Sequence, residues 1–258
     1  MGSYLTGQNC VRVRVANVCK LRHSGPMLSD SQFLTRLDLV ALAFFLLCWG
    51  VFSPGVIGRI ISRPTLTSMM DGQRSNWMRT MARRELRMVD TGIMSGLQQG
   101  TAFFASSCLL AIGGCFALFG STDAFLEVLS EIPAPQIASR KAFEAKVFGL
   151  IGILSYGFFK FGWSYRLFNY CSILMGAVPS YREDPALQPE LDVAVQRATR
   201  MNVLAGRHFN EGLRAIFFAL AYLGWFIGAW MLIATTVFII FVEIRRQFFS
   251  AARDAVAE

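Results

Sequence analysis

Charged residues are scarce in this sequence. Asp, Glu, Lys and Arg together make up 16% of its 258 residues, whereas about 25% is usual for a soluble globular protein. Hydrophobic residues reach 54%, and 23 residues are Phe. A soluble fold this poor in charge would have difficulty covering its own surface, so the composition favours an integral membrane protein.

The residues of a metal centre or of a familiar enzyme are also missing. The chain has 2 histidines and 6 cysteines, with no CxxC pair, which argues against a zinc site, a bis-histidine haem and a disulfide framework. It contains no GxSxG, HExxH, P-loop or GxGxxG pattern, and these patterns mark several large enzyme classes. We therefore expect no catalytic residue, no metal and no cofactor.

The N-terminal segment, residues 1–30, lacks the apolar run of about 7–15 residues that a signal peptide requires. It can be interpreted as a disordered tail, or as the result of a start assigned too far upstream. In the second case translation begins at Met27 instead of Met1.

Four apolar blocks follow, and each is long enough to cross a bilayer core of about 30 Å as an α-helix. We expect an all-α, polytopic membrane bundle over residues 31–250 and a short tail over 251–258. The four predicted spans lie at about 37–57, 99–120, 147–176 and 215–242. Small residues with a spacing of four, at Gly92, Gly96 and Gly100 and again at Gly224 and Gly228, indicate close helix packing.

Two polar segments, 73–90 and 189–212, have the periodicity of amphipathic helices. The first places Trp77 on an apolar face and a stripe of arginines on another, which is typical of a helix in the lipid interface. Its predicted contacts with lipid headgroups are Trp77, Arg79, Arg83 and Arg87. The alternative is an ordinary amphipathic helix that caps the bundle.

The net charge is +8, from 25 basic and 17 acidic residues. The basic residues lie between the apolar blocks, so we expect the partners to be a bilayer with anionic lipids, other membrane proteins or a second copy, and no nucleic acid. The first and third loops carry 12 basic residues, against 7 on the opposite side, or 11 if the N-terminal tail is counted. This excess favours loops 59–92 and 180–212 in the cytoplasm of a bacterial inner membrane.

Lys160 is a charge well inside the third block, where burial in a bilayer is costly. One hypothesis is a site for an anion or a lipid headgroup, formed by Lys160, Trp163, Arg166 and Asn169. The alternative is a structural role, in which Lys160 pairs with an acid such as Glu211 or extends to the interface.

A second polar cluster stands before the fourth block: His208, Asn210, Glu211 and Arg214. His208 could relay protons, because the unperturbed pKa of histidine is about 6.5. A histidine that only stabilises the helix end is the alternative.

Several segments resemble the membrane-protein family known as domain of unknown function five hundred and ninety-nine, which occurs in bacteria and plants. They include RxxWMRxMxxRExRMVD (74–90), FFKFGWSYRLFNYCSILMGAVP (158–179) and RHFNEGLRAIFFALAYLGWF (207–226). The resemblance covers about residues 37–250 and implies a multi-span membrane protein, but no activity.

Three classes of function follow from these patterns. Packing signals outnumber charges within the spans, so the first expectation is a non-enzymatic accessory or binding component of a membrane complex. The alternative is a transporter or channel for small ions or anionic solutes that uses Lys160. The third is a membrane enzyme that acts on lipid.

Overall fold

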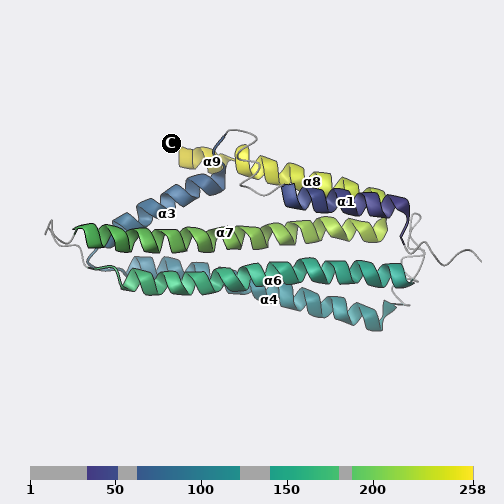
Figure 1. The fold of residues 1–258 in the computed structure, drawn as a ribbon, viewed down its shortest axis with the longest axis horizontal. Helices are drawn as coiled ribbons and strands as arrows, with labels where there is room; N and C mark the ends of the chain where they lie inside the picture. Colours follow the sequence, from purple (N-terminus) through teal and green to yellow (C-terminus); the bar gives the residue numbers. More distant parts are fainter. Residues whose placement is uncertain (1–33, 52–62, 123–139, 180–187, 258) are drawn as a thin grey trace, which may run out of the picture. The chain divides into compact units, whose positions relative to one another are not determined.

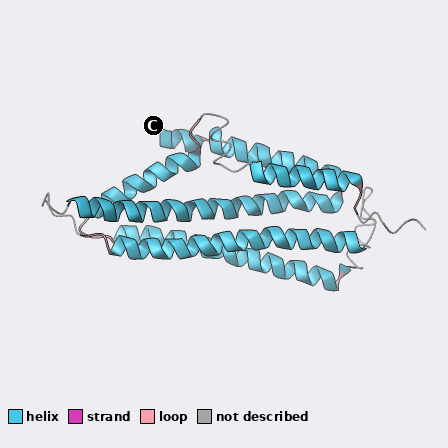
Figure 2. Cartoon of the chain, viewed as in Figure 1, coloured by secondary structure: helices cyan, strands magenta, loops and turns pink. Residues whose placement is uncertain are grey.

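The computed structural model describes residues 34–51, 63–122, 140–179 and 188–257. Every regular element in these ranges is an α-helix, and no strand occurs in them (Figure 2). The all-α class is therefore confirmed. The tail predicted over residues 1–30 lies outside the described residues, whereas residues 34–258 form one compact unit.

Three long helices form the centre of this unit (Figure 1). They are α4 (Met88–Gly120), α6 (Arg140–Gly176) and α7 (Gln188–Ile227), with 33, 37 and 40 residues. At 1.5 Å per residue they measure about 50 to 60 Å, well beyond the bilayer core of about 30 Å. By length and composition alone, α4 and α6 could each cross a membrane.

Neighbouring long helices run antiparallel. Lys146 of α6 contacts Trp225 near the end of α7, and Cys171 near the end of α6 contacts Ala198 near the start of α7. Helix α4 lies on α6 in the same antiparallel sense (Figure 1). At Gly212 a Cβ would stand 2.7 Å from the ring of Phe161, so this glycine is what allows α7 to approach α6 closely.

Four shorter helices complete the unit. They are α1 (Arg36–Val51), α3 (Leu66–Ala82), α8 (Ala229–Phe248) and α9 (Ala251–Ala257). Helices α3 and α8 pack on α7, and α1 packs on α8. Helix α1 is the described part of the first predicted span. Residues 251–257, expected to be a tail, form α9, which packs on α3.

The block 215–242 is not one helix, and this corrects the fourth predicted span. Helix α7 ends at Ile227, the chain reverses at Gly228, and α8 returns antiparallel along α7. The guanidinium of Arg246 is consequently 5.0 Å from the ring of Phe217. A block of this length is long enough for a hairpin, and glycine at the reversal is a poor helix former.

The segment 73–90 is not one helix either. Helix α3 ends at Ala82 and α4 begins at Met88. Asp90 holds the turn between them, because its carboxylate accepts hydrogen bonds from Trp77 Nε1 (2.7 Å) and Arg84 Nη1 (2.6 Å). The polar helix predicted over 189–212 is likewise the first part of α7, without an interruption before residue 215.

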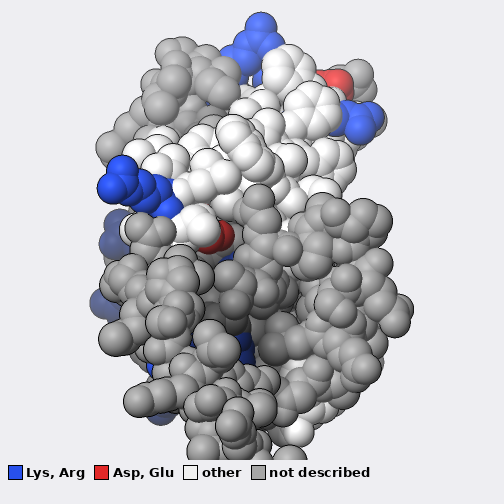
Figure 3. Space-filling view, turned by 90° about the vertical axis from the view of Figure 1, so that its right-hand side faces the viewer, with Lys and Arg blue, Asp and Glu red and all other residues white. Residues whose placement is uncertain are grey.

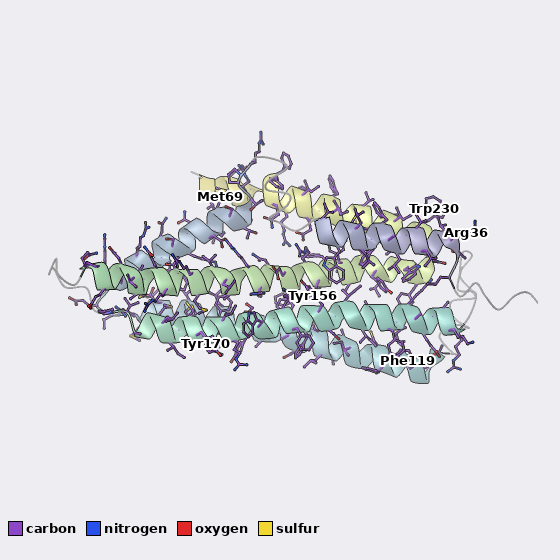
Figure 4. All side chains as sticks on the ribbon, in the orientation of Figure 1. Arg36, Met69, Phe119, Tyr156, Tyr170 and Trp230 are labelled. Carbon is purple, nitrogen blue, oxygen red and sulfur yellow. The ribbon has the colours of Figure 1, made fainter. Side chains whose placement is uncertain are left out.

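The bundle contains two separate hydrophobic cores. One is rich in aromatic residues and joins α1, α4, α6, α7 and α8; it includes Phe45, Phe143, Phe218, Tyr222 and Trp225. The other is rich in methionine and joins α3, α4, α6 and the start of α7; it includes Met78, Met81, Met94, Phe168 and Met175. Figure 4 shows the two halves, with Trp230 and Arg36 at one end and Tyr170 toward the other.

Candidate functional site

The clearest polar contact between α6 and α7 lies where the two cores meet. Lys160 Nζ is 2.5 Å from Glu211 Oε2, and the two side chains are 26% and 32% exposed. The ammonium also lies 5.2 Å from the centre of the Tyr156 ring. Glu211, considered as a partner for Lys160 from the sequence, is the partner in the structure, which supports the structural alternative for this lysine.

Further charged residues lie around this pair, at the same height along the helix axes. His208 Nδ1 is 3.5 Å from Glu211 Oε2, and Arg214 interacts electrostatically with Glu243 of α8. Arg246 Nη2 is 3.6 Å from Glu243 Oε1. We call this set the charged belt; it consists of Lys160, His208, Glu211, Arg214, Glu243 and Arg246. Asn210, predicted to join the cluster, is half-buried in the same part of α7.

The other residues of the predicted anion site lie elsewhere. Asn169 is nine residues from Lys160, about 13 Å along the helix axis, and its Oδ1 accepts a hydrogen bond from Gln98 Nε2 (2.8 Å). Arg166 Nε donates to the hydroxyl of Tyr170 (3.0 Å), and Trp163 is 47% exposed. The structure thus does not bring the four side chains to one place.

Two of the four residues predicted to contact lipid headgroups, Trp77 and Arg87, make hydrogen bonds within the protein. Trp77 donates a hydrogen bond to Asp90, and Arg87 Nη1 donates to the carbonyl oxygens of Met175 (2.9 Å), in the last turn of α6, and of Val178 (2.8 Å), just after it. Such carbonyls have no partner within their own helix. Arg87 therefore joins the α3–α4 turn to α6. Arg79 and Arg83 are exposed and line a groove of about 410 Å³ between α3 and α7.

A buried cluster that sequence reasoning missed lies at the other end of α7. Trp225 Nε1 donates to Asp38 Oδ1 (2.6 Å), and Lys146 Nζ donates to the carbonyl oxygen of Trp225 (2.9 Å). Asp38 is 5% exposed and Lys146 2%. The sequence places Lys146 among the loop charges, because hydropathy alone does not show that α6 begins at Arg140.

One signal in the sequence could have placed Asp38. Thr35 and Asp38 form a capping box, in which Asp38 N donates to Thr35 Oγ1 (3.1 Å) and Thr35 N donates to Asp38 Oδ2 (3.1 Å). This spacing of a hydroxyl residue and an acid is a recognised helix start. It fixes the first turn of α1 and orients the carboxylate toward Trp225.

A second missed contact joins α3 to α7. The guanidinium of Arg74 donates to the buried side chain of Asn202. Gly206 makes room for it, since a Cβ there would be 2.9 Å from the guanidinium carbon. Nearby, Arg207 Nη2 is 3.2 Å from Asp71 Oδ2. Burial raises the pKa of Asp71 and lowers that of Arg74, because desolvation disfavours the charged form of each group.

Within the described ranges no three His, Cys, Asp or Glu side chains gather as metal ligands. No curated protein and no solved structure matches the chain significantly. The family model described as "Protein of unknown function, DUF599" matches residues 40–252, a range that includes both cores, the charged belt and the buried Lys146. The chain belongs to this family.

Proposed function

We propose that the chain is a membrane protein that crosses the bilayer five times and acts as a non-enzymatic component of a membrane assembly. The five crossings are α1, α8 and the aromatic-core halves of α4, α6 and α7. Twenty residues of α6 separate Arg140 from Lys160, which is about 30 Å along a helix and equals the thickness of a bilayer core. The charged belt then lies at one membrane surface.

Large apolar side chains on the outside of the aromatic-core half of the molecule support the proposal. The most exposed ones include Leu47 (63%), Leu110 (81%), Phe238 (62%) and Trp230 (67%). They occupy three different helices, so most of the outer surface of this half is apolar. Contiguous apolar surface of this kind is rare on soluble monomers and is favourable against lipid.

The distribution of basic residues supports an orientation in the membrane. The end that starts at the arginines of the charged belt includes 14 described basic residues: Arg63, Arg74, Arg79, Arg83, Arg84, Arg87, Arg166, Arg197, Arg200, Arg207, Arg214, Arg245, Arg246 and Arg253. The opposite end has 4 among the described residues, namely Arg36, Arg140, Lys141 and Lys146. Figure 3 faces this second end, and its described surface is mostly uncharged. The positive-inside rule favours the first end in the cytoplasm of a plasma membrane.

The α7–α8 hairpin supports the proposed orientation. In a four-span protein Arg245, Arg246 and Arg253 would lie opposite the other arginines and nearly cancel the bias. The hairpin returns them to the arginine-rich side, together with the C-terminus. In this proposal the described parts of the predicted cytoplasmic loops 59–92 and 180–212 stay on the cytoplasmic side.

The assembly role rests on the outer face of α4. Only 11% of its most apolar stretch is buried, against 44% for α6. Gly113 and Gly114 lie on it, and a Cβ added at either position would meet nothing within 4 Å. Small residues are where membrane helices approach one another. This bare face is the observation that carries the proposal of a binding component.

Two measurements test the proposal. Green fluorescent protein fused after Glu258 should fluoresce and alkaline phosphatase at the same place should be inactive, because five crossings put this terminus in the cytoplasm. Leu110→Cys on the outer face of α4 should form a specific crosslink in native membranes, whereas Phe238→Cys on α8 should not. An active phosphatase fusion would contradict the threading, and equal crosslinking of both positions would contradict the assembly role.

Transport through the charged belt is the second candidate, since Lys160, Glu211 and His208 lie within 3.5 Å of their neighbours. Exchange of a carboxylate between two cationic groups is a step that ion-coupled carriers use. Proteoliposomes should then show chloride or proton flux that Lys160→Met abolishes. If wild-type flux equals that of empty vesicles, this candidate is wrong.

A further inference from the structure

A groove opens between α1 and α6 on the outside of the aromatic core. Its volume is about 630 Å³, within the range of about 300–1,000 Å³ that small-molecule sites occupy. Leu46 and Trp49 of α1 form one wall, and Ile153 and Tyr156 of α6 form the other. The rings of Trp49 and Tyr156 meet edge to face, with centroids 5.4 Å apart.

Glycines keep the groove open along its length. Gly50 and Gly152 both line it, and an added Cβ would meet nothing within 4 Å at either position. A larger residue at Gly152 would therefore enter the groove instead of disturbing the packing of α6. The walls next to it are apolar and extend in the direction of the helices, which suits a hydrocarbon chain.

Arg214 closes the end of the groove that lies at the charged belt. Lys160 is close by, over the ring of Tyr156, which also lines the groove. Three cations of the charged belt, Lys160, Arg214 and Arg246, outnumber its two acids, Glu211 and Glu243. A guanidinium has five N–H donors in a fork, so Arg214 can interact with Glu243 and bind a phosphate at the same time.

We propose that the groove binds one anionic glycerophospholipid of the cytoplasmic leaflet. Its phosphate contacts Arg214, and one acyl chain lies between α1 and α6 over Gly152. An occupant with a charged end and a long apolar part matches both the cationic end and the apolar walls. The proposal rests on the five-crossing arrangement, which puts Arg214 at the depth of the cytoplasmic headgroups.

The test is native mass spectrometry of the full chain, purified in mild detergent and mixed with equal amounts of dioleoylphosphatidylglycerol and dioleoylphosphatidylcholine. The wild type should retain one phosphatidylglycerol in about fivefold preference, the effect of one arginine near an anionic lipid. Arg214→Gln should remove the preference, and Gly152→Leu should remove the retained lipid. Arg245→Gln and Gly162→Leu, matched changes at exposed positions outside the groove, should behave like the wild type.

Equal retention of the two lipids by the wild type would overturn the proposal, as would unchanged lipid binding in Gly152→Leu. Displacement of the lipid by millimolar inorganic phosphate would identify a free anion as the ligand, which also overturns it. If Arg214→Gln does not fold, Arg214→Lys provides the same comparison, with a weakened preference expected. The fusion after Glu258 reports on the threading independently, so failure of the lipid site and failure of the proposed function can be distinguished.

Discussion

Lys146 and Lys160 show how differently two lysines of one helix can be placed. Lys146 is almost fully buried, and it is held by the last turn of α7, where the carbonyl of Trp225 has no partner within the helix. Lys160 is partly exposed and pairs with Glu211. The sequence marks Lys160 as the costly charge because apolar residues surround it, whereas the burial of Lys146 depends on where α6 begins and on a residue of α1.

Removal of the buried lysine should be strongly destabilising. Lys146→Met leaves the carbonyl oxygen of Trp225 without the ammonium that donates to it. It also removes a positive charge that interacts electrostatically with Asp38, and loss of a buried hydrogen bond to a charged group costs about 2–3 kcal/mol. The double variant Asp38→Asn with Lys146→Met should recover part of this loss. Unfolding in detergent by titration with dodecyl sulfate measures both values. Lys141→Met, an exposed neighbour on α6, is the control, and an effect as large as that of Lys146→Met would contradict the expectation.

Removal of Lys160 should have a much smaller effect on stability. The Lys160–Glu211 pair is about one-quarter to one-third exposed, and exposed pairs contribute about 1 kcal/mol or less. Lys160→Met should therefore lower the unfolding free energy by no more than this amount in the same titration. A loss comparable to that of Lys146→Met would show that the charged belt is shielded from water, contrary to the exposure of Lys160 and Glu211.

At the scale of helices, hydropathy located the apolar segments but not the reversal within the last one. A block such as 215–242 looks the same whether it is one long helix or a hairpin. The distinction depends on Gly224, where α7 and α8 are so close that a Cβ would meet Thr235 Oγ1 at 2.5 Å and the carbonyl oxygen of Met231 at 3.0 Å. The spacing of Gly224 and Gly228 indicated close packing, and the structure shows that Gly224 packs against the next helix of the same chain.

Substitution at Gly224 should open this hairpin. Gly224→Val forces α8 away from α7, and overpacking of this kind costs about 1–3 kcal/mol. It should also weaken the hydrogen bond from Thr235 Oγ1 to the carbonyl oxygen of Ala221. Thermal unfolding in detergent measures the loss. Gly228→Ala, where an added Cβ meets nothing within 4 Å, should be nearly neutral, and equal effects at the two glycines would contradict the packing explanation.

At the scale of the whole chain, the two cores suggest two different environments. The sequence predicts membrane crossing from each apolar block separately, and it places the third span at 147–176. The structure suggests another position for the bilayer, because Lys160, Glu211 and Glu243 lie at one level across three helices. In this arrangement the part of α6 after Lys160 extends into the cytoplasm with the methionine-rich core. No single segment carries this information, since it comes from the alignment of charges on neighbouring helices.

Two exposed residues on the long helices can distinguish a bilayer that ends at the charged belt from one that surrounds residues 147–176. Leu110 of α4 is 81% exposed and lies in the aromatic half, and Ile173 of α6 is 68% exposed and lies about 20 Å beyond Lys160 along the helix. In a cysteine-free background, Ile173→Cys should react with a water-soluble maleimide from the cytoplasmic side, and Leu110→Cys should react only after the membrane is dissolved. If the bilayer instead surrounds 147–176, Ile173→Cys will be protected as well. Rapid labelling of both cysteines in intact membranes would show that water reaches both halves, and the five-crossing arrangement would then be wrong.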